Sequence, residues 1–279
     1  MKKTLVAHLG AHKTATSLVQ KYFKAKTKYY RKQGIQFLSR EQVSPYISWG
    51  DKIVKNGDKF RDYLNEQAAK TTADHLMFSN ENILGRPFPD REGLYPNHEP
   101  IVKSLKAATG AFNTKIVYGI RPQVDFLQSY YLQRVHQGDF MTFNQFLDEI
   151  DLDTISWRPM IECLQDTFGK DNVIVLDFSL IKMGQNKFIQ HFLDVSIRPG
   201  IVIDEDYDEV HNPSISDRGL HLALRINPLL RKGETGNVRR FLQTYFSNQT
   251  EPRPVLMSES VKADLNARYD AEYQDLITK

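Results

Sequence analysis

Short apolar runs alternate with longer segments of helical periodicity along the first 200 residues. The apolar runs, which are rich in residues that favour strands, lie at 4–9, 75–79, 114–120 and 172–178. Helical periodicity begins near Thr16 and continues to Gly34, resumes after Pro122, and returns after Gly184. Near-continuous apolar strands that alternate with helices are typical of a parallel sheet covered on both faces. The pattern therefore predicts an α/β fold, a three-layer α/β/α arrangement with a central parallel sheet.

The strand signal fades after about residue 200, where helical periodicity marks 220–230, 239–246 and 258–277. A Pro-rich stretch at 85–100 is expected to form a long surface loop, and long structured loops often carry function. No repeat or low-complexity tract interrupts the chain. We therefore expect a single domain over 1–279, with an α/β core in 1–200 and a mainly helical C-terminal part in 201–279.

Composition narrows the classes of partner. The 279 residues are 41% hydrophobic and 25% charged, with a formal net charge of +3, so any anion site must be local. We expect no nucleic-acid partner, because the basic, aromatic-rich segment 21–32 is better explained by packed rings and solvated lysines. Cys163 is the only cysteine, which excludes a disulfide framework within the chain and favours a cytoplasmic location. No apolar stretch is long enough for a membrane span.

The first apolar run leads into a turn with the residue types of an anion site. The turn is GAHKTA (10–15), and a helix is expected to open at Thr16. A helix N-terminus presents unpaired N–H groups and a partial positive charge. Thr14, Thr16 and Ser17 add hydroxyl groups and Lys13 adds a mobile cation, which together suit a phosphate monoester. The alternative is a helix start with hydroxyl caps and a solvated lysine, and the turn alone leaves both open.

The turn does not match the Walker A loop of P-loop nucleotide-binding proteins. That pattern requires G-x-x-x-x-G-K-[ST], whereas here Gly10 is followed by two residues and then Lys13, with no glycine before the lysine. The shorter turn suits one phosphate group rather than a triphosphate.

A second candidate follows the apolar run 114–120. Arg121 lies directly after this strand, at the edge where open parallel sheets bind ligands, and Ser129 lies about two turns into the next helix. An arginine can contact two phosphate oxygens while a serine hydroxyl donates to a third. The alternative is a solvated arginine and a serine without a role.

Together the segments HLGAHKTATSLVQ and VYGIRPQVDFLQSYY resemble, in order, the two cofactor motifs of the PAPS-dependent sulfotransferases, where PAPS is 3′-phosphoadenosine 5′-phosphosulfate. The resemblance covers most of the chain, through 172–181 and 211–216. It implies the P-loop NTPase-like sulfotransferase fold and PAPS as the co-substrate without a metal. It implies that the 5′-phosphosulfate is bound by His12, Lys13, Thr14, Ala15, Thr16 and Ser17. It also implies that Arg121 and Ser129 bind the 3′-phosphate.

The sequence departs from the family pattern at two positions. Ala15 stands where many members have glycine, which is tolerable if its φ is negative. Leu18 stands where cytosolic members often have a tryptophan, and this favours the carbohydrate and bacterial branch. The segment 230–237 resembles the R-K-G-x-x-G closure over the 3′-phosphate, so Arg231 and Lys232 are candidate contacts, or a chance match in a solvated turn.

The resemblance implies in-line transfer of a sulfuryl group to a hydroxyl or amine of an acceptor, which is expected to be a carbohydrate or another small metabolite. Catalysis then depends on positioning and electrostatics, with Lys13 neutralising the leaving oxygen. The expected base is Glu81, directly after the run 75–79, because the carbohydrate branch has a glutamate there in a similar S-x-E context. Alternatively, Glu81 caps the turn or pairs with Arg86. His8 and then His136 are the competing bases.

Two other functions remain open. A P-loop nucleotide kinase could use Asp177 as its Walker B aspartate, although the first loop lacks the required spacing. A catalytically silent protein could bind nucleotide or glycan, although the presence of Lys13 and Glu81 argues against it. Candidate contacts to the acceptor are Trp49, Arg86, His98, Arg134 and His136, while Trp157 is expected in the core. The sequence leaves the oligomeric state and the identity of the acceptor open.

Overall fold

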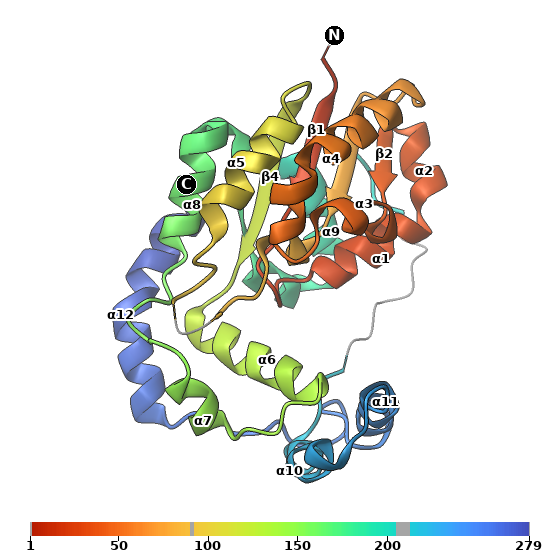
Figure 1. Cartoon of the computed structure of the whole chain (residues 1–279). Coiled ribbons are helices and arrows are strands. Elements are labelled where there is room, and N and C mark those ends of the chain that lie inside the picture. Colours follow the sequence, from red (N-terminus) through yellow and green to blue (C-terminus); the bar gives the residue numbers. More distant parts are fainter. Residues whose placement is uncertain (1, 90–91, 205–212, 279) are drawn as a thin grey trace. The chain divides into compact units, whose positions relative to one another are not determined.

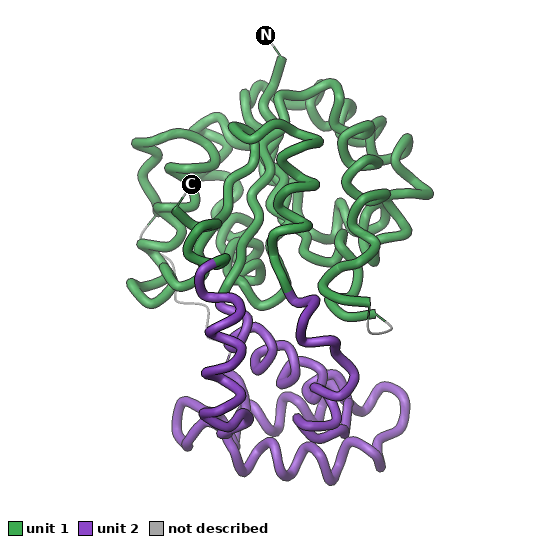
Figure 2. The backbone as a smooth tube through the Cα atoms, turned by 90° about the vertical axis from the view of Figure 1, so that its left-hand side faces the viewer, with its two compact units in different colours: residues 1–121, 156–210, 272–279 green, residues 122–155, 211–271 purple. Residues whose placement is uncertain are grey.

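The computed structural model describes residues 2–89, 92–204 and 213–278. Its backbone divides into two compact units (Figure 2). The first unit contains Met1–Arg121, Ser156–Val210 and Glu272–Lys279, and the second contains Pro122–Ile155 and His211–Ala271. The single domain expected over 1–279 stays a prediction.

The first unit is built on a five-stranded, all-parallel sheet with the strand order β2-β3-β1-β4-β5. The strands are β1 (Thr4–His8), β2 (Ile35–Leu38), β3 (His75–Ser79), β4 (Asn113–Ile120) and β5 (Val173–Asp177). The central strand β1 pairs with β3 and β4, so the carboxyl ends of these three strands meet at one edge. Four strands lie within one residue of their predicted bounds. The short edge strand β2 was not predicted.

Helices cover both faces of this sheet (Figure 1). One face is covered by α1 (Thr16–Ala25), α2 (Thr27–Lys32) and α9 (Gln185–Ser196), and the other by α3 (Arg40–Ile47), α4 (Asp51–Ala69), α5 (His98–Ala108) and α8 (Arg158–Phe168). The predicted α/β class with a central parallel sheet between helical layers is therefore confirmed.

Alternation along the strands explains why both faces are covered. Val6, Met77 and Val117 point into the core that α1 and α9 complete. On the other face the ring of Phe78 packs edge-on against Phe60 of α4, with 5.7 Å between centroids. Apolar side chains on both faces of these strands are thus removed from water, which is why the strands read as near-continuous apolar runs.

The helix expected over 16–34 is instead two helices. Lys26 separates α1 from α2 with non-helical angles, and the hydroxyl of Thr27 donates to the carbonyl of Phe23 at 2.9 Å. Gly34 has a φ of 81° and ends the segment as predicted, because this region of backbone space favours glycine. Short 3-10 turns also occur in this unit: η1 (Glu81–Leu84), η2 (Lys170–Asn172) and η3 (Phe178–Met183).

The described part of the second unit is helical. It contains α6 (Gln123–His136), α7 (Phe143–Asp148), α10 (Asp217–Ile226), η4 (Asn227–Leu229), α11 (Thr235–Tyr245) and most of α12 (Glu259–Ile277). The rings of Tyr131, Phe143 and Phe146 form its aromatic centre. The stretch 211–216, part of the family resemblance, begins outside the described residues. Among the described helices, none is both long and apolar enough to cross a bilayer.

Candidate active site

The turn between β1 and α1, residues 10–17, is called the anion loop below. It lies at the carboxyl edge of the sheet, where the N–H of Ala11 donates to the carbonyl of Gly119 at 2.9 Å. The loop packs closely on β4, since a Cβ at Gly119 would lie 2.8 Å from Oγ1 of Thr14. A Cβ at Gly10 would lie 2.5 Å from Cγ2 of Thr16. Only glycine permits this approach at either position.

Two residues of the anion loop have left-handed backbones although neither is glycine. The φ angle is 67° at Lys13 and 65° at Ala15, and a side chain in this region is strained. The condition that Ala15 keep a negative φ is therefore not met. Alternation of left-handed and other residues turns successive N–H groups toward one point, the geometry of an anion-binding nest.

The strained turn leaves a row of donors unused. The backbone N–H groups of Thr14, Ala15, Thr16 and Ser17 donate to no atom among the described residues. These groups belong to the N-terminus of α1, where the helix dipole adds positive potential. The Thr14 hydroxyl differs from its expected role, because it is buried and donates to the carbonyl of Ala11 at 2.6 Å. Thr14 can therefore contribute its N–H rather than its hydroxyl.

Arg121 is fixed beside this loop. It follows β4, and its guanidinium donates to the carbonyl of Lys13 at 3.2 Å. The same guanidinium lies over the ring of Phe178, 4.6 Å from the centroid, and the Arg121 carbonyl accepts from the indole N–H of Trp157 at 2.9 Å. The structure thus brings together the first predicted motif and the arginine of the second.

Three predicted cofactor contacts belong to the second unit. Ser129 is half-buried in α6. Arg231 and Lys232 are exposed in the turn between η4 and α11, where the N–H of Arg231 donates to the Glu234 carboxylate at 2.8 Å. Because the anion loop belongs to the first unit, a role for these residues at the 3′-phosphate stays a prediction.

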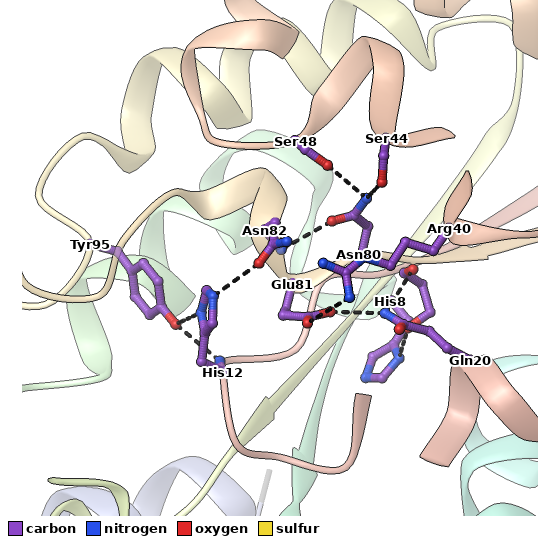
Figure 3. A network of polar contacts seen from close by, with 11 residues as sticks. His8, His12, Gln20, Arg40, Ser44, Ser48, Asn80, Glu81, Asn82 and Tyr95 are labelled. Carbon is purple, nitrogen blue, oxygen red and sulfur yellow. Dashed lines mark hydrogen bonds and ion pairs between the residues drawn. The ribbon is translucent and has the colours of Figure 1, made fainter. Parts of the chain in front are cut away.

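Glu81 opens η1, with one residue between it and the end of β3, at the same sheet edge as the anion loop. Its side chain is largely buried, and the residue is 8% exposed. One carboxylate oxygen accepts from Nε2 of Gln20 at 2.8 Å, and the other lies 3.7 Å from the guanidinium of Arg40 (Figure 3). Gln20 also donates to the Ser79 carbonyl at 3.1 Å, so it links the carboxylate to the end of β3.

The expected alternative partner of Glu81, Arg86, is exposed, and the arginine that pairs with Glu81 is Arg40. Glu81, Gln20, Arg40, Asn82 and His12 are called the carboxylate cluster below. Sequence reasoning named Glu81 and His12 and missed the other three. No local signal marks Gln20 or Arg40, because each occupies an ordinary polar helical position.

Asparagines on either side of Glu81 hold its backbone in place. The side-chain oxygen of Asn80 accepts from the N–H of Asn82 at 3.0 Å and so caps η1. The amide of Asn80 donates to the hydroxyls of Ser44 and Ser48, at 3.1 and 3.3 Å (Figure 3). Because both serines belong to the end of α3 and the turn after it, the carboxylate has a fixed position relative to that helix.

His12 joins the anion loop to the carboxylate cluster. Its Nε2 lies 3.2 Å from the side-chain oxygen of Asn82, which can only accept, so Nε2 carries the proton. Its Nδ1 then accepts from the Tyr95 hydroxyl at 2.7 Å, while the hydroxyl oxygen accepts from the His12 N–H at 3.0 Å. Burial lowers the pKa of His12, and the charge of Glu81 and the bond to Asn82 oppose this shift. The imidazole is therefore a neutral, fixed bridge.

His8, the first competing base, lies inside the core. It is fully buried, its Nδ1 lies 2.9 Å from the Ser79 hydroxyl, and its ring packs edge-on against Phe192 at 5.1 Å. Burial lowers the pKa of His8 to about 4, and the Glu81 carboxylate opposes this effect. Its Nε2 has no hydrogen-bond partner within residues 2–89, 92–204 and 213–278. His136, the second competing base, lies in α6 of the second unit.

The remaining candidates have distinct surroundings. Trp157 is fully buried, as predicted, while Trp49 is 54% exposed. Asp177 accepts from the N–H of Ser179 at 2.7 Å and contacts the Tyr273 hydroxyl, so its carboxylate is engaged in structural contacts rather than available as a Walker B aspartate. In the other unit Arg134 pairs with two carboxylates, of Asp139 at 2.6 Å and Glu149 at 2.9 Å.

No protein-family model and no curated protein matches the sequence. Among solved structures, the chain is similar to a sulfotransferase from Alicyclobacillus acidocaldarius, with a TM-score of 0.48 and 14% identity over 74% of this chain and 85% of that chain. It is also similar to mouse sulfotransferase SULT7A1 complexed with PAP, with a TM-score of 0.42 and 10% identity over 100% of this chain and 86% of that chain. These structural neighbours are sulfotransferases.

Proposed function

We propose that this protein is a PAPS-dependent sulfotransferase that transfers a sulfuryl group to a hydroxyl or amine of a small acceptor. One observation carries the proposal. Four successive N–H groups, from Thr14 to Ser17, have no acceptor among the described residues and lie beside the cations of Lys13 and Arg121. A purely structural turn would leave few buried donors without an acceptor. Unused N–H donors at a helix N-terminus beside two cations instead favour a site for a phosphate group.

The residues present fit the two anionic ends of PAPS. The anion loop would hold the 5′-phosphosulfate through its N–H groups and Lys13. Arg121 would hold the 3′-phosphate, with Ser129, Arg231 and Lys232 as further candidates. Fixed N–H groups and two cations supply the positive potential that such a group needs, since preorganised donors stabilise developing charge without reorganising.

Glu81 is the proposed base. When bound, PAPS supplies the sulfuryl group: the acceptor oxygen or nitrogen forms a bond to sulfur while the bond from sulfur to the 5′-phosphate oxygen breaks. The acceptor's proton passes to the Glu81 carboxylate, whose orientation is held by Gln20 and Arg40. Lys13 neutralises the charge left on the phosphate. His12 stays neutral and keeps Asn82, and with it the backbone after Glu81, in place.

Calorimetry without metal ions tests this function. We expect 3′,5′-ADP to bind at least about tenfold more tightly than 5′-AMP, because one charge-assisted contact contributes roughly 1.5–3 kcal/mol. Equal affinities, or binding of ATP that requires Mg²⁺, would contradict the proposal and favour a nucleotide kinase. Tight binding of 3′,5′-ADP without transfer from PAPS to any acceptor would instead identify a catalytically silent nucleotide-binding protein.

A further inference from the structure

An open pocket of about 520 Å³ lies beside the carboxylate cluster, within the first unit. Its volume falls in the range of about 300–1,000 Å³ that is typical of small-molecule sites. The pocket is lined by Arg40, Glu41, Ser44, Pro45, Ser48, Trp49, Lys52 and Asn82. Two of these residues are tied to the proposed base: Arg40 pairs with Glu81, and Asn82 follows it in the chain. A ligand in this pocket would therefore contact the group that holds Glu81.

Trp49, which forms one wall of the pocket, has a strained backbone and an exposed side chain. Its φ is 66°, a left-handed conformation that is unfavourable for a bulky residue. Two backbone bonds hold it there, from the Trp49 N–H to the Asn82 carbonyl at 2.6 Å and from the Asp51 N–H to the Trp49 carbonyl at 2.7 Å. The indole nevertheless stays 54% exposed. Strain that presents an apolar ring to solvent beside a polar pocket is more typical of ligand-binding sites than of packing.

The polar groups of the pocket favour a hydroxylated ligand with negative charge. Arg40 and Lys52 contribute two cations, and Lys52 makes no ion pair with any described residue. The one carboxylate, Glu41, is exposed and pairs with Lys24 at 2.8 Å. Two hydroxyl groups also line the pocket, and each accepts from Asn80 while its own O–H is left to donate; they belong to Ser44 and Ser48.

We propose that this pocket binds the acceptor and that the acceptor is an anionic saccharide, a hydroxylated ring that carries a carboxylate or a sulfate. The flat apolar face of a sugar ring suits the indole of Trp49, and its hydroxyl groups suit Ser44 and Ser48. The anionic group is attracted by Lys52 and Arg40, which bind carboxylate and sulfate alike. The assignment as acceptor rests on the proposed function, whereas the binding itself does not.

The two tryptophans make the binding directly measurable. Trp49 is 54% exposed and Trp157 is buried, so acrylamide should quench the fluorescence of Trp49 selectively. We expect methyl β-D-glucuronide and glucose 6-sulfate to protect Trp49 from acrylamide, and methyl β-D-glucoside to bind at least about tenfold more weakly. Which of the two anions binds better distinguishes a carboxylate from a sulfate. Trp49→Phe should remove the protected signal and thereby assign it.

Lys52→Gln should weaken binding of both anionic sugars about five- to tenfold and leave the neutral sugar unaffected. Lys55→Gln is the matched control, because Lys55 is exposed one turn further along α4, pairs with Asp51 at 2.8 Å and does not line the pocket. Both changes are on the surface and should leave the circular dichroism spectrum unchanged. Equal binding of charged and neutral sugars, or no protection of Trp49 by any of them, would overturn the inference.

Parallel titrations with 3′,5′-ADP separate the two proposals. Protection of Trp49 by anionic sugars without binding of 3′,5′-ADP supports the pocket and contradicts the sulfotransferase function. Binding of 3′,5′-ADP with no protection of Trp49 by these sugars supports the function and contradicts the pocket.

Discussion

The anion loop and the carboxylate cluster lie in the same unit but are built in opposite ways. The loop consists of consecutive residues, contains two residues with strained backbones and leaves four N–H groups without an acceptor in the described part of the chain. The cluster is assembled from separate segments, and its hydrogen bonds and ion pair hold a buried carboxylate in one orientation. The loop therefore has donors available for the anion that the proposed function requires, whereas the groups of the cluster already hold one another in place. Under the proposed function, the loop would bind the anion and the cluster would take up a proton without rearranging.

Glu81→Gln is expected to have the largest effect on transfer, because it keeps the shape of the carboxylate cluster and removes its proton acceptor. Glutamine can still accept from Gln20 but cannot take a proton. We expect transfer from PAPS to fall by about 10²–10⁴, while binding of 3′,5′-ADP at the loop stays within about twofold. Single-turnover rates and calorimetry measure the two quantities. A fully active variant would remove Glu81 from the mechanism and leave the base to be found elsewhere.

Lys13→Ala tests whether the anion loop contributes to the transfer step as well as to nucleotide binding. If this lysine neutralises the leaving oxygen, the turnover number should fall by about 10²–10³, whereas affinity for 3′,5′-ADP should fall by about tenfold or less. The melting temperature should hardly change, because the side chain is not part of the core. Lys21→Ala, an exposed lysine on α1, is the control and should keep wild-type turnover. Equal losses in turnover and affinity would show a binding role only.

The buried histidines make stability depend on pH. His8 has its pKa lowered from 6.5 to about 4, so between these values the unfolded chain binds a proton that the folded chain does not. The free energy of unfolding therefore has its full value above about pH 6.5. As the pH falls from there toward 4, it decreases by up to about 3 kcal/mol, because protonation of His8 favours the unfolded chain. Burial of His12 acts in the same direction.

Urea unfolding at several pH values measures this effect, and NMR titration of the His8 ring assigns it. We expect the ring to remain neutral until about pH 4. A ring that titrates near pH 6.5 in the folded protein would show that the imidazole reaches water. It would also restore His8 as a candidate base.

Gln20→Leu tests whether turnover depends on the orientation of the Glu81 carboxylate as well as on its presence. The change removes the 2.8 Å bond to Glu81 while keeping the size of the side chain. We expect the turnover number to fall about tenfold with an unchanged Michaelis constant for PAPS, because Gln20 contacts Glu81 and not the loop. Gln20→Glu should lower turnover further, since it places a second carboxylate against the first. A change in the Michaelis constant alone would contradict a positioning role.

The difference between loop and cluster also explains how much could be predicted from the sequence. The sheet could be predicted because buried parallel strands are continuous apolar runs, and the anion loop because its residues are contiguous. Arg121 could be predicted because it follows a strand, and the structure places its guanidinium against the Lys13 carbonyl. These features depend on local order along the chain.

The cluster could be predicted only at Glu81 and His12. Gln20 meets Glu81 across 61 residues of sequence, and His12 meets Tyr95 across 83. Such contacts depend on the pairing of β1 with β3 and on the course of the 85–100 loop, which no local pattern records. The left-handed angle of Ala15 was also beyond prediction, because alanine ordinarily avoids that conformation and sequence alone gives no sign that packing imposes it.

Ala15→Gly should produce the smallest effect and tests the strain of the loop directly. A non-glycine residue in the left-handed region costs about 1–2 kcal/mol, while glycine adds unfolded-state entropy that costs about 0.4–1 kcal/mol. The variant should therefore be more stable than wild type by up to about 1.5 kcal/mol in urea unfolding. Ala263→Gly, exposed inside α12, is the control and should lose about 0.5–1 kcal/mol, because glycine weakens a helix interior. If Ala15→Gly loses as much stability as the control, Ala15 does not have a left-handed backbone. The N–H groups of the loop would then have to converge on an anion in a different backbone conformation.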